Sequence, residues 1–126
     1  PKNMIEEIQA ACRESGQPIP KTVGELVMCV YSNLARIYAR ELKQLEDLSG
    51  KTIDYLHVVG GGSNVSLLNQ LTANLIGKEV IAGPGEATAI GNILVQMISV
   101  GEFENLSQAR HWLASSSSFE CYRPQI

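Results

Sequence analysis

The sequence predicts an α/β fold that is mostly helical and carries a short parallel sheet. Two consecutive segments, 56–77 and 78–98, each have a short apolar strand pattern, a glycine-containing turn and a helical pattern. Strand–helix–strand units of this kind form parallel sheets with right-handed connections. The first fifty residues have helical periodicity instead. We expect all 126 residues to form one unit, 1–126, without an internal domain boundary.

The N-terminal part is expected to form two helices. Apolar residues at helical spacing predict the first helix from residue 2 to about residue 14, and the proline- and glycine-rich segment 15–20 ends it. Thr22 and Glu25 have the spacing of a capping box, in which the threonine accepts from the third helical amide and the glutamate reaches back. A long helix is therefore expected over residues 23–49.

The three cysteines, Cys12, Cys29 and Cys121, are too few and too scattered for a disulfide framework or a metal site. The turn at 15–20 should fold the first two helices into an antiparallel pair, which places Cys12 and Cys29 on facing apolar sides. We expect these two to be close, as a disulfide or as two packed thiols. The packed pair is favoured, because cytoplasmic proteins keep their thiols reduced. No metal site is expected.

The central feature is a strand near residues 56–59 that stops at three glycines and a serine, Gly60 to Ser63. A helix is expected to follow over residues 67–76. Such a turn presents backbone N–H groups and the positive end of a helix dipole, so the expected ligand is a phosphate or a nucleotide. The alternative is a tightly packed turn without a ligand. The turn is not a P-loop, and Val65 stands where a dinucleotide fingerprint has its third glycine.

The remaining pattern predicts a second strand at 78–82, a turn at 83–85 and a helix over 86–98. Gly91 inside that helix suggests close packing against a neighbour, because glycine costs roughly 1 kcal/mol there relative to alanine. A last short helix is expected near 107–113, and the serines at 115–118 are expected to form a loop into an irregular tail. Two short strands make a poor sheet, so either the fold is unusually helical or its sheet is completed elsewhere.

Composition excludes several classes of protein. The chain is 44% hydrophobic and 18% charged, which is typical of a globular domain rather than a disordered one. Its net charge of -3 argues against a nucleic-acid surface, which needs a basic patch. No apolar run approaches the roughly 20 residues of a membrane span, and no signal peptide is visible. We expect no nucleic-acid or membrane partner, and the cytoplasm as the compartment.

The glycine turn and its surroundings resemble the adenosine-binding loop of FGGY-family sugar kinases, which belong to the actin-like ATPase superfamily. The resemblance rests on Gly-Gly-Gly-Ser at 60–63, the helix pattern at 67–74, the short strand at 80–82 with the Gly-Pro turn, and Glu-Ala-x-Ala-x-Gly at 86–91. It covers nearly the whole chain. It implies that the chain is the C-terminal part of an actin-like (ribonuclease H-like) domain, the second, nucleotide-side domain of a two-domain kinase.

The resemblance also implies ATP-dependent phosphorylation of a sugar with magnesium. The family's catalytic aspartate and two further phosphate loops come from earlier in the chain, so no catalytic residue is expected here, and the sugar and magnesium should bind mainly to the portion outside this chain. The nucleotide contacts carry over onto Gly60, Gly61, Gly62, Ser63 and Asn64. Val65 replaces a residue that is often polar in relatives, so backbone contacts should contribute more. An isolated fragment of a larger sheet is also expected to self-associate.

Two alternatives remain open at this stage. The chain could be a non-catalytic nucleotide-sensing or scaffold domain built on the same actin-like half. It could also be a helical interaction module with a tight βα turn. The upstream sequence discriminates between them, because an aspartate-containing catalytic segment and a second phosphate loop there would identify a kinase.

Overall fold

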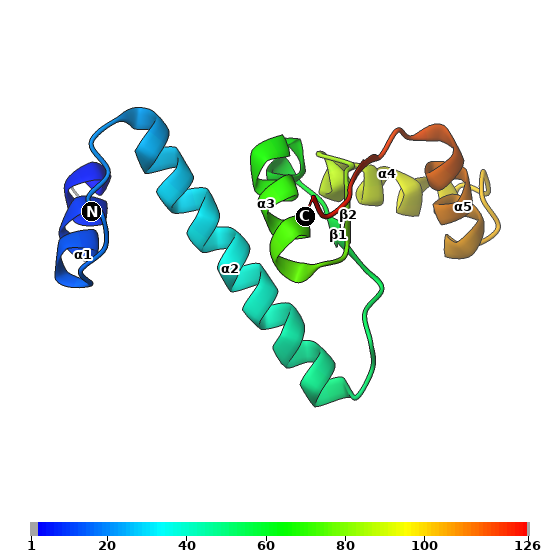
Figure 1. The fold of residues 1–126 in the computed structure, drawn as a ribbon. Helices are drawn as coiled ribbons and strands as arrows, with labels where there is room; N and C mark the ends of the chain where they lie inside the picture. The colour runs from blue at the N-terminus through cyan, green and yellow to red at the C-terminus, as the bar shows by residue number, and fades with distance from the viewer. Residues whose placement is uncertain (1–2, 126) are drawn as a thin grey trace.

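The computed structural model describes residues 3–125. Helices come first, and the three short strands are spread over the rest of the chain (Figure 1). The elements in order are α1 (Met4–Glu14), α2 (Val23–Ser49), β1 (Tyr55–Val58), the 3-10 turn η1 (Gly61–Asn64), α3 (Ser66–Ile76), β2 (Glu79–Ala82), α4 (Ala87–Ser99), α5 (Leu106–Ser116) and β3 (Glu120–Tyr122).

The strands form one sheet in the order β1-β2-β3, with β2 in the centre. β1 and β2 are parallel, with Leu56 opposite Val80, as the sequence predicts. β3 then runs antiparallel to β2, with Cys121 opposite Ile81. The prediction of a purely parallel sheet is therefore wrong, and so is the prediction of an irregular tail. The tail turns back along the second edge of β2, whose backbone groups it pairs.

Helices cover one face of the sheet in successive layers. α3 packs on β2, α2 packs on α3, and α1 lies outermost beside the first half of α2 (Figure 1). Side chains alternate along a strand, and the buried residues of β2, Val80 and Ala82, face this helical side. The other buried apolar residues of these layers are Leu68 and Ala73 in α3, Ala35 and Leu42 in α2, and Cys12 in α1.

The ends of the long helices follow the predicted local signals. Thr22 and Glu25 form the complete capping box at the start of α2. Gly50 and Gly77 follow α2 and α3 with φ of 64° and 65°, the left-handed conformation in which glycine ends a helix. Such ends depend on neighbouring residues only, which is why the sequence predicts them.

The C-terminal helix is longer than predicted. Ser115 and Ser116 belong to α5, so the predicted loop at 115–118 begins only at Ser117. Both hydroxyls donate to the carbonyl of Trp112, each at 2.8 Å. Each hydroxyl thus bonds to a carbonyl of the preceding turn, a pattern that serine shows within helices.

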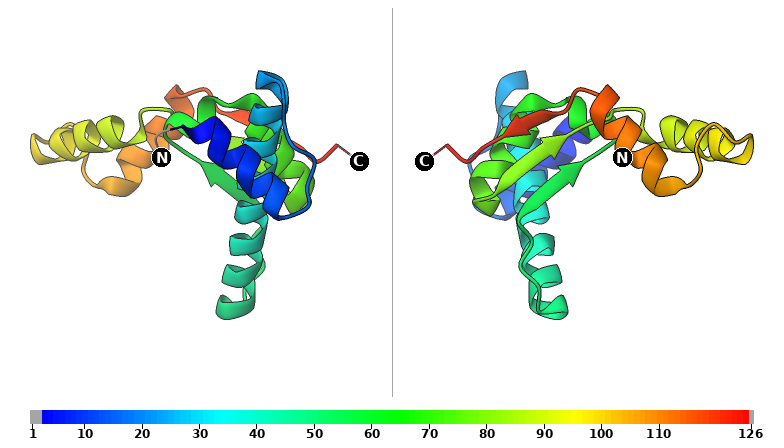
Figure 2. Two further views of the ribbon diagram at one scale, coloured as in Figure 1. Left: turned by 90° about the vertical axis from the view of Figure 1, so that its left-hand side faces the viewer. Right: turned by 90° about the vertical axis from the view of Figure 1, so that its right-hand side faces the viewer.

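α4 and α5 form a lobe on the side opposite α1 and α2 (Figures 1 and 2). The ring centroids of Phe103 and Trp112 lie 5.7 Å apart within this lobe. A Cβ on Gly91 would meet no heavy atom within 4 Å, so no described residue supplies the close neighbour that this glycine suggests. Within residues 3–125, no helix combines the length and the apolar composition required to cross a membrane.

Candidate functional site

The glycine turn begins with a backbone conformation that only glycine adopts readily. Gly60 has φ 79° and ψ -167°. Its N–H donates to the carbonyl of Pro84 at 3.1 Å, and its carbonyl accepts from the Ser63 hydroxyl at 2.7 Å. Ser63 is buried, so this hydroxyl holds the turn from inside. Gly60 and Ser63 thus fix the shape of the loop.

Gly61 and Gly62 differ from Gly60. Neither has a positive φ, and both lie at the start of the 3-10 turn. A Cβ built on either would meet no atom within 4 Å. Neither backbone strain nor internal packing therefore requires glycine at these two positions. Their backbone is open to close approach from outside the chain.

Asn64 connects the glycine turn to the turn after β2. A Cβ on Gly85 would lie 3.1 Å from Nδ2 and 3.2 Å from Oδ1 of Asn64, closer than the amide could tolerate without moving. The two turns are also joined by the N–H of Gly83, which donates to the Val58 carbonyl at 2.9 Å. Val65 precedes α3 and makes no side-chain capping bond there.

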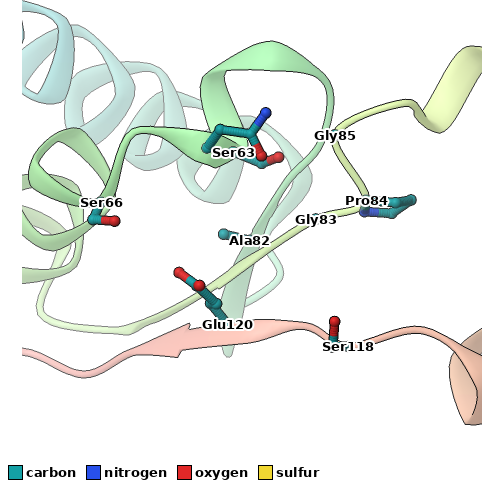
Figure 3. A pocket seen from close by; sticks show the side chains of 9 residues that line it. Ser63, Ser66, Ala82, Gly83, Pro84, Gly85, Ser118 and Glu120 are labelled. Carbon is teal, nitrogen blue, oxygen red and sulfur yellow. The ribbon is translucent and has the colours of Figure 1, made fainter.

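A cavity of about 280 Å³ opens between these turns and the start of β3. Glu120 and Ser118 point toward it from the β3 side, opposite Ser63 and Ser66 (Figure 3). The full lining is Ser63, Asn64, Ser66, Ala82, Gly83, Pro84, Gly85, Ser118 and Glu120. Of the predicted site residues, Ser63 and Asn64 line this cavity, whereas Gly60, Gly61 and Gly62 do not.

Sequence reasoning missed several residues of the lining. The sequence predicts a turn at 83–85 and its Gly-Pro pair contributes to the family resemblance, but no ligand contact is assigned to this turn, although the carboxyl ends of parallel strands meet at one edge of a sheet. That rule would have placed this turn beside the glycine turn. Ser118 and Glu120 gave no comparable signal, because their place depends on a strand that the sequence does not predict.

The side chain of His57 contacts the Gly83–Gly85 turn. Nε2 of His57, on β1, donates to the carbonyl of Gly83. Its ring meets the ring of Phe119 edge-on, with centroids 5.7 Å apart.

The structure also brings Cys12 and Cys29 together. Their Sγ atoms lie 3.8 Å apart, and both are free thiols. Burial, followed by the hydrogen bond and charge of Cys29, raises the pKa of the Cys12 thiol above its ordinary value. The pair lies between α1 and α2, away from the glycine turn. No cluster of three or more histidine, cysteine, aspartate or glutamate side chains suited to a metal occurs within residues 3–125.

Comparison with known proteins identifies the family. The family model for the C-terminal domain of the FGGY family of carbohydrate kinases matches residues 2–100. The chain belongs to this family. The matched part of this FGGY C-terminal domain contains the glycine turn and the Gly83–Gly85 turn, whereas Ser118 and Glu120 lie beyond it.

The FGGY chain is similar to proteins named rhamnulokinase in several bacteria. It is 53% identical over 125 residues to that of Ligilactobacillus salivarius, 51% to that of Lactiplantibacillus plantarum and 49% to that of Bacillus subtilis. Each match covers 99% of this chain and 26% of the relative. The chain thus spans about a quarter of the length of these relatives.

The cavity and the glycine turn offer different groups to a ligand. Among the residues that line the cavity, only Glu120 has a side chain that ionises near neutral pH. The glycine turn instead offers backbone amides without side chains in the way. A flat or anionic ligand can lie against such a backbone.

Proposed function

We propose that this chain is the adenosine-binding part of an ATP-dependent sugar kinase. In this proposal, residues 1–126 form the C-terminal portion of the second, nucleotide-side domain of an actin-like ATPase, without an internal boundary. The full-length protein phosphorylates L-rhamnulose to L-rhamnulose 1-phosphate in the cytoplasm. Membership of the FGGY family and the similarity to three proteins named rhamnulokinase support this proposal.

The observation that carries the nucleotide assignment is the pair Gly61 and Gly62. Glycine loses more conformational entropy on folding than any other residue. Here neither φ nor packing gives a reason for it, since a Cβ at either position would meet open space. Close approach of a nucleotide to the backbone supplies that reason.

In the proposed complex, the adenosine and inner phosphate of ATP or ADP lie against Gly60–Ser63, with Asn64 beside them. The backbone N–H groups of Gly61 and Gly62 orient the ligand, because those of Gly60 and Ser63 already donate to the carbonyls of Pro84 and Gly60. The N-terminal end of α3 follows at once and favours negative charge. Because Val65 offers no hydrogen bond to a base, these backbone contacts carry most of the recognition.

The described residues contain no group of three or more histidine, cysteine, aspartate or glutamate side chains that could hold a metal ion. On the resemblance to two-domain FGGY kinases, we assign the sugar, the catalytic base and most of the magnesium contacts to the portion of the protein outside this chain. One wall of a cleft cannot enclose a ligand, so the chain alone binds nucleotide weakly and phosphorylates no sugar.

The test is Gly61→Val in the full-length kinase. This variant should fold, because Gly61 has an ordinary φ and open space around its Cβ position. The added side chain should occupy the nucleotide's place and raise the KM for ATP about tenfold, equivalent to about 1.4 kcal/mol. The KM for the sugar should change less than about twofold on the same scale.

Gly24→Val is the matched control. Gly24 lies in α2, away from the glycine turn, and its Cβ position is also open. This variant should leave the KM for ATP unchanged. A folded Gly61→Val kinase with a wild-type KM for ATP would show that the nucleotide assignment is wrong.

A further inference from the structure

We propose that His57 is a positioning residue for nucleotide binding, which acts by holding the Gly83–Gly85 turn against the glycine turn. It touches neither nucleotide nor sugar. This inference rests on the proposed function, because it concerns the same nucleotide site.

The two turns meet through their backbones. Gly83 N–H donates to the carbonyl of Val58 at 2.9 Å, and Gly60 N–H donates to the carbonyl of Pro84 at 3.1 Å. These bonds join the carboxyl ends of the parallel strands β1 and β2. The position of the Gly83–Gly85 turn therefore sets one wall beside the glycine turn.

Glycine flanks Pro84 on both sides, so the proline ring fixes φ at Pro84 only and the two flanking residues are held by their contacts. Gly83 has φ 112°, a conformation that other residues rarely adopt. The turn therefore depends on external contacts to hold its shape.

His57 supplies such a contact. A carbonyl oxygen can only accept, so the hydrogen of the bond to Gly83 is on Nε2 of His57. The ring of Phe119 also meets the imidazole edge-on, with centroids 5.7 Å apart, and so limits its movement. Backbone bonds hold the N–H of Gly83, and His57 holds its carbonyl.

The Gly83–Gly85 turn also determines where Asn64 lies. Gly85 approaches the Asn64 amide so closely that a Cβ on Gly85 would be 3.1 Å from Nδ2. If the bond from His57 is lost, the Gly83–Gly85 turn can move, and Asn64 and the cavity wall lose their fixed position. A nucleotide would then have to order these groups as it binds, which weakens its affinity.

The experiment compares His57→Phe and His57→Gln in the full-length kinase. Phenylalanine keeps a ring against Phe119 but has no donor, whereas glutamine keeps an N–H donor. A hydrogen bond contributes about 0.5–1.5 kcal/mol net, so His57→Phe should raise the KM for ATP about two- to tenfold. The kcat and the KM for the sugar should stay close to wild type, and His57→Gln should restore much of the ATP KM.

His111→Phe is the matched control, because His111 lies exposed in α5 and does not line the cavity. It should leave the KM for ATP unchanged. His57→Leu is a second donor-free variant if His57→Phe does not fold, and the Tm of every variant is measured alongside.

A lowered Tm with a wild-type KM for ATP in the donor-free variants would overturn the inference, because His57 would then be only structural. Equal increases in the KM for ATP and for the sugar, or a His57→Gln variant no better than His57→Phe, would also overturn it. Gly61→Val separates the two proposals. If that variant raises the KM for ATP and the donor-free variants do not, only the role of His57 fails.

Discussion

At the scale of single residues, the three cysteines differ in reactivity because they differ in exposure. Cys121 is exposed, Cys29 is half-buried and Cys12 is buried. Burial and the neighbouring Cys29 raise the pKa of Cys12, so a smaller fraction of it is the reactive thiolate. We predict that alkylation of the native full-length protein at neutral pH modifies Cys121 first and Cys12 last.

Peptide mapping by mass spectrometry measures these rates. After denaturation without reductant, all three cysteines should be modified, because the structure contains free thiols. Recovery of Cys12 and Cys29 as one cross-linked pair before reduction would show a disulfide and would contradict this prediction.

Residues whose role is local could be predicted from the sequence. Gly60 to Asn64 follow a strand and precede a helix, so their place in a turn depends on adjacent residues only. His57, Gly85 and Glu120 matter through partners 20 or more positions away in sequence, such as the contact from His57 to Gly83. No pattern within a short window indicates such a contact.

At the scale of elements, the ion pair of Lys78 and Glu46, together with the backbone of Ile53, links three separate segments of the fold. Lys78 Nζ lies 2.8 Å from Glu46 Oε1 and donates to the Ile53 carbonyl at 2.6 Å. Glu46 also accepts from the Ile53 N–H at 2.8 Å. The group ties the end of α2 to the segment before β1 and to the start of β2. Both side chains are largely shielded, with 22% and 24% of their surface exposed.

This group predicts a dependence of stability on pH. The hydrogen bond from Lys78, and then that from the Ile53 amide, lower the pKa of Glu46 below its ordinary value of about 4.3. A lowered pKa in the folded state stabilises the fold above the ordinary value, and this contribution is lost as the pH falls through the folded pKa.

The measurement is urea unfolding of the full-length protein at pH 7 and at pH 3. Glu46→Gln should reduce the stability at pH 7 and should reduce the further loss on going to pH 3. Glu41→Gln is the control, because Glu41 is exposed and, among residues 3–125, forms an ion pair only with its neighbour Arg40. Equal acid sensitivity in wild type and Glu46→Gln would contradict the assignment.

The strands show which elements a sequence can predict. β1 and β2 are flanked by glycine turns and helices, and these local signals identify them. β3 has three residues, and long-range bonds hold it in place. Gln70 Nε2 donates to the carbonyl of Arg123 at 2.8 Å, and the N–H of Gln125 donates to Asn74 at 2.8 Å. Its existence therefore depends on α3 and β2 rather than on its own composition.

At the scale of the whole molecule, the chain exposes more surface than a compact protein of its size. Its accessible surface is 8905 Å², whereas a compact monomer of 13.7 kDa exposes about 6,600 Å². Many large apolar side chains are exposed. A groove of about 840 Å³ between β1, α4 and α5 carries the exposed side chains of Tyr55, Val59 and Val95.

This excess predicts that the 126-residue chain, expressed alone, self-associates. β1 is an edge strand with one unpaired side, and the apolar groove lies beside it, so two copies can bury both surfaces at once. Sedimentation velocity should show dimers or larger species whose fraction rises with concentration.

Val95→Glu should weaken this association, because it places a charge in the groove. Gln96→Glu, on the same helix but outside the groove lining, should not. A monomer at all concentrations would contradict this prediction. If the proposed function is correct, the full-length kinase should be insensitive to concentration under the same conditions, since its remaining three quarters would cover the groove and the edge of β1.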